Sequence, residues 1–305
     1  MPFIKRKFFV QEKQRAFMFL IHELGYTQKE AQRLIAHGRL FIGGEPMVTP
    51  TLEIEGEFEF IQYEPSTREL QADVVEKHFV IFNKPSGVLI HPQNRDTEYS
   101  LVDELKYQFG LQANIAHRID QETSGLVLCA RDKQSEKDLK MLFESRNIQK
   151  KYLALVHGEL KEELIIKEPL LRKEDDSAIV RMVVKVHPDG KASKTTISPL
   201  KYFAEKDMTL VECQPFTGRQ HQIRVHLFHV KHPIVGDPIY GQSEEDVLRF
   251  LDKTITNEQR LKKSGATRLL LHANELKFIL YGVEHHIKSQ ENFAKTCLKY
   301  LKPQQ

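Results

Sequence analysis

The sequence predicts an α+β fold, because strand-like and helix-like patterns alternate along its 305 residues. Apolar runs bounded by turn residues, at 79–82 and 126–130, have the length and composition of short buried strands. The amphipathic segment 101–109 has a helical period instead. Further strand patterns at 195–203 and 208–214 are consistent with an antiparallel meander. These patterns together favour antiparallel strands combined with helices.

Residues 1–63 are expected to form a small separate domain. A helical period over residues 14–24 is followed by a capping box, in which Thr27 precedes Glu30 by three positions and starts a second helix. The segment 64–76 contains Pro, Ser, Thr and several charged residues, which is typical of a linker.

The rest of this N-terminal domain is predicted to be strands. Residues 39–48 indicate a strand, a Gly-Gly turn and a second strand. Residues 53–60 alternate between acidic and apolar side chains, as expected of a half-buried strand with Ile54, Phe58 and Phe60 facing inward.

Composition and charge set broad limits on function. The chain is 40% hydrophobic and 29% charged, which is ordinary for a globular protein, and its net charge is only +3. Residues 1–50 carry eight Lys or Arg against four acidic residues, whereas residues 53–76 carry eight acidic residues and one Arg. This asymmetry fits a nucleic-acid-binding module, and a pair of solvated faces is the alternative.

The three cysteines, Cys129, Cys213 and Cys297, are widely separated and form no CxxC pair. Neither a zinc ribbon nor a disulfide framework is indicated, and we expect reduced thiols in a cytoplasmic protein. We also expect no signal peptide and no membrane association, because no uncharged run approaches the length of a membrane span.

The most informative stretch places His117, Arg118 and Asp120 within four positions. A Thr-Ser-Gly sequence at 123–125, which we interpret as a turn, leads into the apolar run 126–130. Asp120 is therefore expected on a loop held by a core strand, where catalytic groups concentrate. An isolated HRxD pattern more often caps a surface turn or forms a surface ion pair between Asp120 and Arg118.

Four segments in order resemble the motifs of the RluA-type RNA pseudouridine synthases. They resemble the signature around the catalytic aspartate, the first motif, the tyrosine-bearing strand and the arginine-bearing motif of that family. The segments are HRIDQETSGL (117–126), FNKPSGVLIHP (82–92), KKYLALVHG (150–158), and TGRQHQIRVHL (217–227) followed by HPIVGDPIYG (232–241).

The resemblance implies that residues 77–300 form a catalytic domain with a mixed, largely antiparallel sheet and a basic central cleft. Such an enzyme isomerises specific uridines in structured RNA to pseudouridine. Asp120 would act at the sugar carbon as nucleophile or base, Arg224 would pair with it, and Tyr152 would stack on the target base. We expect no cofactor, because the reaction has no redox step, and no metal ion, because the histidines near Arg224 fit no zinc signature.

Other residues are expected to contact RNA. Arg118 would fill the space left by a flipped nucleotide or hold its phosphate. The set near the cleft also includes His117, Thr123, Lys84, His91, Arg219, His221 and Gln222. For Lys84 and His91, solvated surface positions are the alternative.

The N-terminal domain resembles the alpha-L RNA-binding module, although Gly43 stands where that module usually has Asn. The resemblance implies that Lys29, Arg33 and Arg39 contact RNA phosphates. Similar modules on large-subunit rRNA modifiers favour rRNA over tRNA as the partner, and no obligate protein partner is indicated. A small helical cap packed on the catalytic domain is the alternative.

Three other functions are open at this point. The chain could be a tRNA pseudouridine synthase or a non-catalytic RNA-binding assembly factor. It could also be a hydrolase that uses Asp120 with His117 and releases free uracil.

Overall fold

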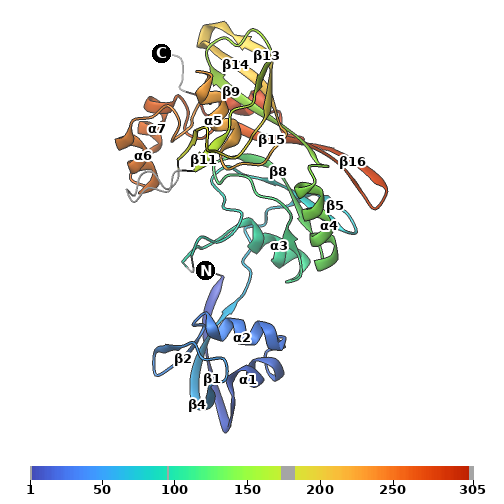
Figure 1. The fold of residues 1–305 in the computed structure, drawn as a ribbon. Helices are drawn as coiled ribbons and strands as arrows, with labels where there is room; N and C mark the ends of the chain where they lie inside the picture. Colours follow the sequence, from blue (N-terminus) through green and yellow to red (C-terminus); the bar gives the residue numbers. More distant parts are fainter. Residues whose placement is uncertain (1, 95, 173–182, 302–305) are drawn as a thin grey trace. The chain divides into compact units, whose positions relative to one another are not determined.

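The structure, a computed structural model, describes residues 2–94, 96–172 and 183–301 (Figure 1). The secondary structure of these residues is α+β, as predicted, and their strands form a four-stranded, a ten-stranded and a two-stranded sheet. No helix in this part of the chain combines the length and hydrophobicity that crossing a bilayer requires. The chain divides into two compact units, each described below by itself.

The smaller unit comprises Met1–Arg68 and His91–Glu104. Its sheet has the strand order β1-β4-β2-β3, and two helices pack together beside it (Figure 1). The elements are β1 (Phe3–Arg15), α1 (Ala16–His22), α2 (Gln28–Ala36), β2 (Leu40–Ile42), β3 (Glu45–Met47) and β4 (Glu53–Tyr63).

Two predictions for this unit are confirmed. Thr27 caps α2, because its hydroxyl accepts the Glu30 N–H while the Glu30 carboxylate accepts the Thr27 N–H. Ile54, Phe58 and Phe60 are buried in the core of the unit.

The predicted start of the first helix at residue 14 is wrong. Residues 3–15 form the long strand β1, antiparallel to β4, and the helix begins at Ala16. Ion pairs between the strands, such as Lys7 with Glu57 and Lys13 with Glu53, hold this polar edge strand. Most side chains of β1 are exposed, so the strand has no alternating apolar pattern by which the sequence could reveal it.

The larger unit, Glu69–Ile90 with Leu105–Gln305, is built on the ten-stranded sheet. The strand order is β10-β13-β14-β9-β15-β8-β6-β5, with β16 beside β15 and β7 beside β8. Its strands are β5 (Ala72–Val75), β6 (Phe79–Lys84), β7 (Asn114–Ile115), β8 (Ser124–Ala130), β9 (Gln149–His157), β10 (Leu164–Ile166), β13 (Thr195–Phe203), β14 (Met208–Pro215), β15 (Leu271–Leu280) and β16 (Val283–Lys288).

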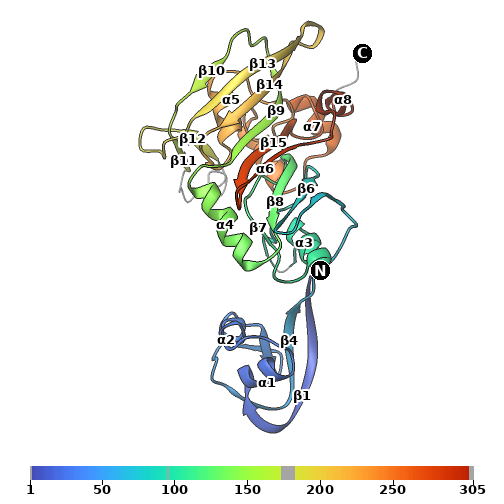
Figure 2. The same ribbon diagram turned by 90° about the vertical axis from the view of Figure 1, so that its right-hand side faces the viewer.

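The predicted mixed, largely antiparallel sheet is confirmed, since β15 runs parallel to β8 and the other pairs of described strands are antiparallel. Figure 2 shows β13, β14, β9 and β15 side by side. A separate two-stranded sheet joins β11 (Leu170–Arg172) to β12 (Val184–Val186). The remaining helices are α3 (Leu101–Phe109), α4 (Lys133–Glu144), α5 (Gln222–His229), α6 (Glu244–Leu251), α7 (Asn257–Ser264) and α8 (Phe293–Leu298).

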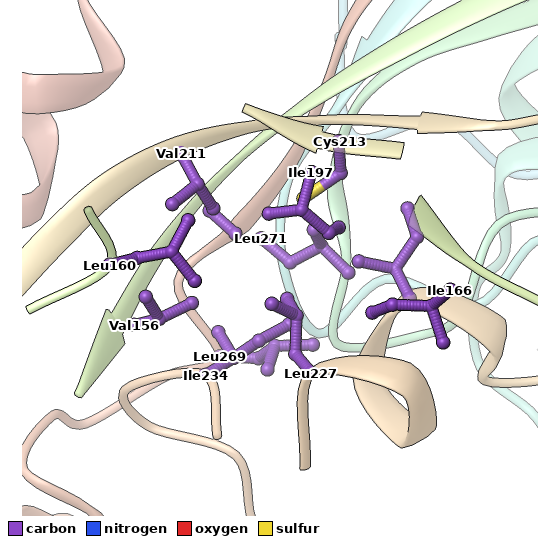
Figure 3. Close-up of a cluster of buried hydrophobic side chains, with 12 residues drawn as sticks. Val156, Leu160, Ile166, Ile197, Val211, Cys213, Leu227, Ile234, Leu269 and Leu271 are labelled. Carbon is purple, nitrogen blue, oxygen red and sulfur yellow. The ribbon is translucent and has the colours of Figure 1, made fainter. Parts of the chain in front are cut away.

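A hydrophobic core fixes α5 against the middle of this sheet (Figure 3). Leu227 of α5 points toward Val156 of β9, Val211 of β14 and Leu271 of β15. These four side chains are between 0 and 3% exposed, so the helix cannot move without opening a cavity in the core. The position of α5 is therefore tightly determined.

Residues 123–125 are not the turn that we expected, because β8 already begins at Ser124. Gly125 pairs with Ala273 at the start of β8, in the parallel β8–β15 contact. Its φ is +111°, and a Cβ there would lie 2.5 Å from the Ala273 nitrogen and closer still to the Ala273 carbonyl oxygen. Glycine at this position lets the two strands approach.

We expect Gly125→Ala to lower the free energy of unfolding by about 3 kcal/mol or more, because the added methyl group overlaps backbone atoms and the positive φ disfavours alanine. Urea unfolding of the purified variant measures this loss. The control is Gly282→Ala at another positive φ (+80°), where no atom lies within 4 Å of the added Cβ. Equal losses in the two variants would show that φ, and not the close approach, is what matters.

Candidate active site

The loop that carries Asp120 is held against strand β8. The His117 Nε2 accepts the Leu128 N–H at 3.0 Å, and the imidazole stacks on Phe143 with ring centroids 4.5 Å apart. The Thr123 N–H donates to the Asp120 carbonyl oxygen at 3.1 Å. The loop therefore presents the Asp120 side chain from a fixed backbone, with His117 and the buried Thr123 serving as internal supports.

Arg224 of α5 is the partner of Asp120. Its Nη1 donates to Asp120 Oδ2 at 3.2 Å, although the two residues are 104 positions apart in the chain. The Arg224 side chain is 3% exposed, whereas that of Asp120 is 26% exposed. A partly open carboxylate is thus held next to a buried guanidinium, so that opposite charges meet at the edge of α5.

Asp237, which the sequence analysis did not single out, holds the other edge of Arg224. Its two oxygens accept from Arg224 Nε and Nη2, both at 2.8 Å, in a bidentate pair. Its Oδ1 also accepts the N–H groups of Ile239 and Tyr240. Burial alone would raise the pKa of Asp237, but Arg224 and these N–H groups bring it below its ordinary value. The signal in the sequence was an acid within HPIVGDPIYG, where it precedes a proline.

His221 lies beside the same carboxylate. Its Nδ1 is 2.9 Å from the Tyr240 hydroxyl, which accepts the Val184 N–H at 3.1 Å. The other ring nitrogen of His221, Nε2, lies 4.0 Å from Asp120 Oδ2. Burial, and then the nearby Arg224, lower the pKa of His221 to about 4, so the imidazole is neutral at pH 7.

Asp120 and Arg224 line a pocket of about 540 Å³. Tyr152 of β9 lines it too, and burial, followed by the negative charge of Asp120, raises the pKa of its phenol. The pocket is basic, as expected of the central cleft: besides Arg224 its lining includes Arg118, Arg146, Lys150 and Arg219, against Asp120 and Glu144. The structure thus brings together the three residues that the sequence placed at the reacting centre.

Besides His117 and Thr123, two more of the expected RNA contacts, Lys84 and Gln222, have internal partners. Lys84 is fully buried, and its Nζ donates to the carbonyl oxygens of Pro85, Val88 and Gln121, each at 2.9 Å. Burial lowers the pKa of Lys84 to about 7. This geometry favours a structural role over the predicted phosphate contact, because all three ammonium protons are used. Surface solvation, the alternative for Lys84, does not apply to a buried group.

Gln222 is the second such residue. Its Oε1 accepts the Thr217 hydroxyl and the Arg219 N–H, and its Nε2 donates to the Lys194 carbonyl and to Thr195 Oγ1. The amide is 4% exposed and has no capacity left for RNA. It holds the turn before α5, so its geometry too favours a structural role.

The remaining predicted RNA contacts are in two places. Arg118, Arg219 and His221 line the pocket of the larger unit. The smaller unit contains His91, Lys29, Arg33 and Arg39; Lys29 and Arg33 are exposed, whereas Arg39 is partly buried with its guanidinium 4.9 Å from the centre of the Phe3 ring.

The support from His117 predicts a pH dependence of stability. Burial lowers the pKa of His117 to about 3, whereas the unfolded chain has a histidine pKa of about 6.5. Between these values the unfolded state binds more protons than the folded state. The contribution of His117 to the free energy of unfolding is therefore fully present above pH 6.5 and is lost as the pH decreases toward 3. We expect the free energy of unfolding to fall between pH 7 and pH 5, with a slope of up to about 1.4 kcal/mol per pH unit from this group.

Urea unfolding at several pH values measures this slope. His117→Gln should reduce it, because glutamine has no proton to take up in this range. His22→Gln, at an exposed position, is the control and should keep the wild-type slope. An identical slope in His117→Gln and wild type would contradict the assignment.

Comparison with known proteins decides the family. A sequence model described as RNA pseudouridylate synthase matches residues 78–229, which include Asp120, Tyr152 and Arg224. An uncharacterized RNA pseudouridine synthase of Helicobacter pylori is 35% identical over 289 residues, covering 95% of this chain and 96% of that protein. This chain belongs to the RNA pseudouridine synthase family.

More distant pseudouridine synthases are similar to this chain in sequence or in fold. The ribosomal large subunit pseudouridine synthase C of Vibrio cholerae is 32% identical over 277 residues, covering 87% of this chain and 80% of that protein. The solved structure of human RNA pseudouridylate synthase domain containing 1 superposes with a TM-score of 0.60 and 24% identity, covering 78% of this chain and 91% of that one. The fold class predicted from the resemblance is therefore confirmed.

Membership of this family also disagrees with two of the alternative functions. A pseudouridine synthase is an isomerase, so the hydrolase and the non-catalytic assembly factor are both wrong. The hydrolase also required His117 as a partner of Asp120, but the His117 Nε2 already accepts the Leu128 N–H.

Proposed function

We propose that this pseudouridine synthase modifies uridines of large-subunit ribosomal RNA, with Asp120, Arg224 and Tyr152 as its catalytic residues. The observation that supports the catalytic assignment is the hydrogen bond between Arg224 and the partly exposed Asp120 carboxylate, in a pocket that Tyr152 also lines.

The proposed chemistry begins with an ionised Asp120. Arg224 stabilises the negative charge that partial burial would otherwise disfavour. When the bond between sugar C1′ and uracil N1 breaks, its electron pair leaves with the uracil, and the carboxylate acts at the sugar as nucleophile or as base. The uracil then rotates, C5 bonds to C1′, the C5 proton leaves and N1 takes up a proton, so that the product is an isomer of the substrate.

Access to this pocket requires the target nucleotide to leave its helix. Flipping a nucleotide costs a few kcal/mol, and least where the base is unpaired. Tyr152 would provide a face for the flipped base. Arg118, exposed at the same pocket, would occupy the vacated space or hold the adjacent phosphate, with Arg219 and His221 also near the nucleotide.

Large-subunit rRNA is proposed as the substrate because relatives that align over most of this chain, such as that of Vibrio cholerae, are named for the ribosomal large subunit. Residues 1–63 would then act as an RNA-binding domain, joined through 64–76 to the catalytic domain 77–300. The exposed Lys29 and Arg33, together with Arg39, would contact backbone phosphates, and so contribute affinity that falls as salt is added.

The test is release of tritium from RNA labelled at uridine C5, because the C5 proton is lost only when C5 becomes bonded to the sugar. The purified enzyme is incubated separately with large-subunit rRNA and with tRNA from cells that lack it. Release from rRNA alone supports the proposal, and release from tRNA alone would favour the alternative substrate. No release from either would contradict the proposed chemistry and substrate together.

A further inference from the structure

Lys150 of β9 lies in the pocket without an internal partner. In the residues that the structure describes, no hydrogen bond or ion pair of its Nζ is found, although the pocket lining includes Glu144 and Asp120. The side chain is only partly exposed, and burial lowers its pKa. An unpartnered cation in such a place is free to pair with a ligand that enters the pocket.

The position of Nζ is known from its neighbours. A Cβ placed on Gly218, in the turn before α5, would be 3.8 Å from it, so Lys150 reaches across the pocket from β9 toward this turn. The positive charge of Lys150 also contributes to the low pKa of His117. The ammonium group therefore lies between the loop of Asp120 and the turn that precedes Arg224.

Lys150 and Tyr152 are two residues apart on one strand, so their side chains leave the same face of the sheet. At about 3.4 Å per residue, their Cα atoms are about 7 Å apart, which is close to the width of a uracil ring. The negative charge of Asp120 acts directly on Tyr152. A base stacked on Tyr152 with its sugar at Asp120 would thus extend within reach of the Lys150 ammonium.

We propose that Lys150 is a catalytic residue that contacts the uracil and stabilises the negative charge on it when it leaves the sugar. This inference rests on the proposed roles of Asp120 and Tyr152. The electron pair of the broken C1′–N1 bond moves into the uracil ring and is shared by N1 and the two carbonyl oxygens, which makes the detached base an anion. An ammonium group at the edge of the ring interacts more strongly with this anion than with the neutral base of the substrate. It therefore lowers the barrier to bond cleavage.

The competing role is a phosphate contact, which would strengthen RNA binding without a specific effect on the chemical step. Arg118 and Arg146 are the exposed cations of the pocket and are better placed for it, because phosphates stay at the solvent side of a flipped nucleotide. A contact to the uracil changes the rate constant for the reaction of bound RNA. A phosphate contact changes the dissociation constant of the RNA and its dependence on salt.

The experiment measures single-turnover tritium release at saturating enzyme, together with RNA binding, for Lys150→Met and Lys150→Arg. We expect Lys150→Met to lower the rate constant by about 100-fold with little change in the dissociation constant. Lys150→Arg, which keeps a positive charge, should recover part of the rate. The neighbouring Lys151 is the matched control, since its side chain leaves the opposite face and pairs with Glu212 at 2.9 Å. Lys151→Met should keep the wild-type rate.

The outcomes separate the possibilities. A wild-type rate for Lys150→Met at saturation, with weaker binding and a salt slope reduced by about one, would overturn the inference in favour of a phosphate contact. Equal rate losses in Lys150→Met and Lys150→Arg would exclude charge stabilisation, and thermal unfolding of both variants identifies a loss that comes from misfolding. An inactive wild type would refute the proposed function itself, whereas an active wild type with an unaffected Lys150→Met would refute only the role of Lys150.

Discussion

Asp120→Asn is expected to abolish pseudouridine formation while the protein stays folded. The substitution keeps the size of the side chain but removes the charge that would act at the sugar carbon, and loss of a group of this kind costs on the order of 10⁴-fold in rate. Stability should change little, because Arg224 keeps its bidentate partner Asp237 and is not left as an unpaired buried charge.

Single-turnover tritium release measures the loss, and urea unfolding confirms that the variant is folded. Glu144→Gln is the matched control, since Glu144 is the other acid that lines the pocket and is exposed to solvent. Its rate should stay near that of the wild type. If Asp120→Asn retained more than about a hundredth of the wild-type rate, Asp120 would not be the group that acts at the sugar.

Asp237→Asn is expected to cost both stability and activity. Asp237 is 1% exposed and carries the charge that balances Arg224, so its loss leaves a buried guanidinium with only the partly exposed Asp120 as partner. Breaking a buried ion pair in this way costs about 3–5 kcal/mol of folding free energy. In asparagine an NH₂ group also replaces one of the two carboxylate oxygens. One N–H group of Arg224 would then face another donor in place of an acceptor.

The activity of Asp237→Asn should fall because Arg224 is no longer held in place beside Asp120. Urea unfolding and single-turnover tritium release measure the two effects. Glu284→Gln provides the comparison, because Glu284 forms an exposed ion pair with Lys277 on the β15–β16 hairpin, and solvent screens exposed pairs so that they contribute little to stability. Similar unfolding curves for the two variants would show that the buried pair contributes no more than the exposed one.

Residues close together in the chain were predictable from sequence. The capping box of Thr27 and Glu30, the strand after the Asp120 loop and the helix at 101–109 each depend on neighbouring residues alone. The pairing of Asp120 with Arg224 was expected only because the ordered motifs resemble a known family. No local pattern connects two residues that are 104 positions apart.

The roles of single polar side chains were harder to predict. Lys84 and Gln222 were expected at RNA because their residue types suit that role, but both are consumed by internal hydrogen bonds. Asp237 and Tyr240 were missed for the opposite reason, since a DPxY sequence gives no sign that its acid will face a buried arginine. Donors and acceptors are satisfied across the folded core, and which of them remain available depends on every neighbouring element.

The sequence by itself predicted the fold class, the order of the motifs and, through the resemblance, the residues that we propose for the reacting centre. The tertiary structure alone decided which of these residues face the pocket and which support it. The physical reason is that patterns of hydrophobicity and turns act over a few residues, whereas burial and ion pairing depend on the sheet order that brings β8, β9, β14 and α5 together. The same arrangement leaves Lys150 open to a ligand and closes Lys84 against the backbone, although both are lysines in motifs of one family.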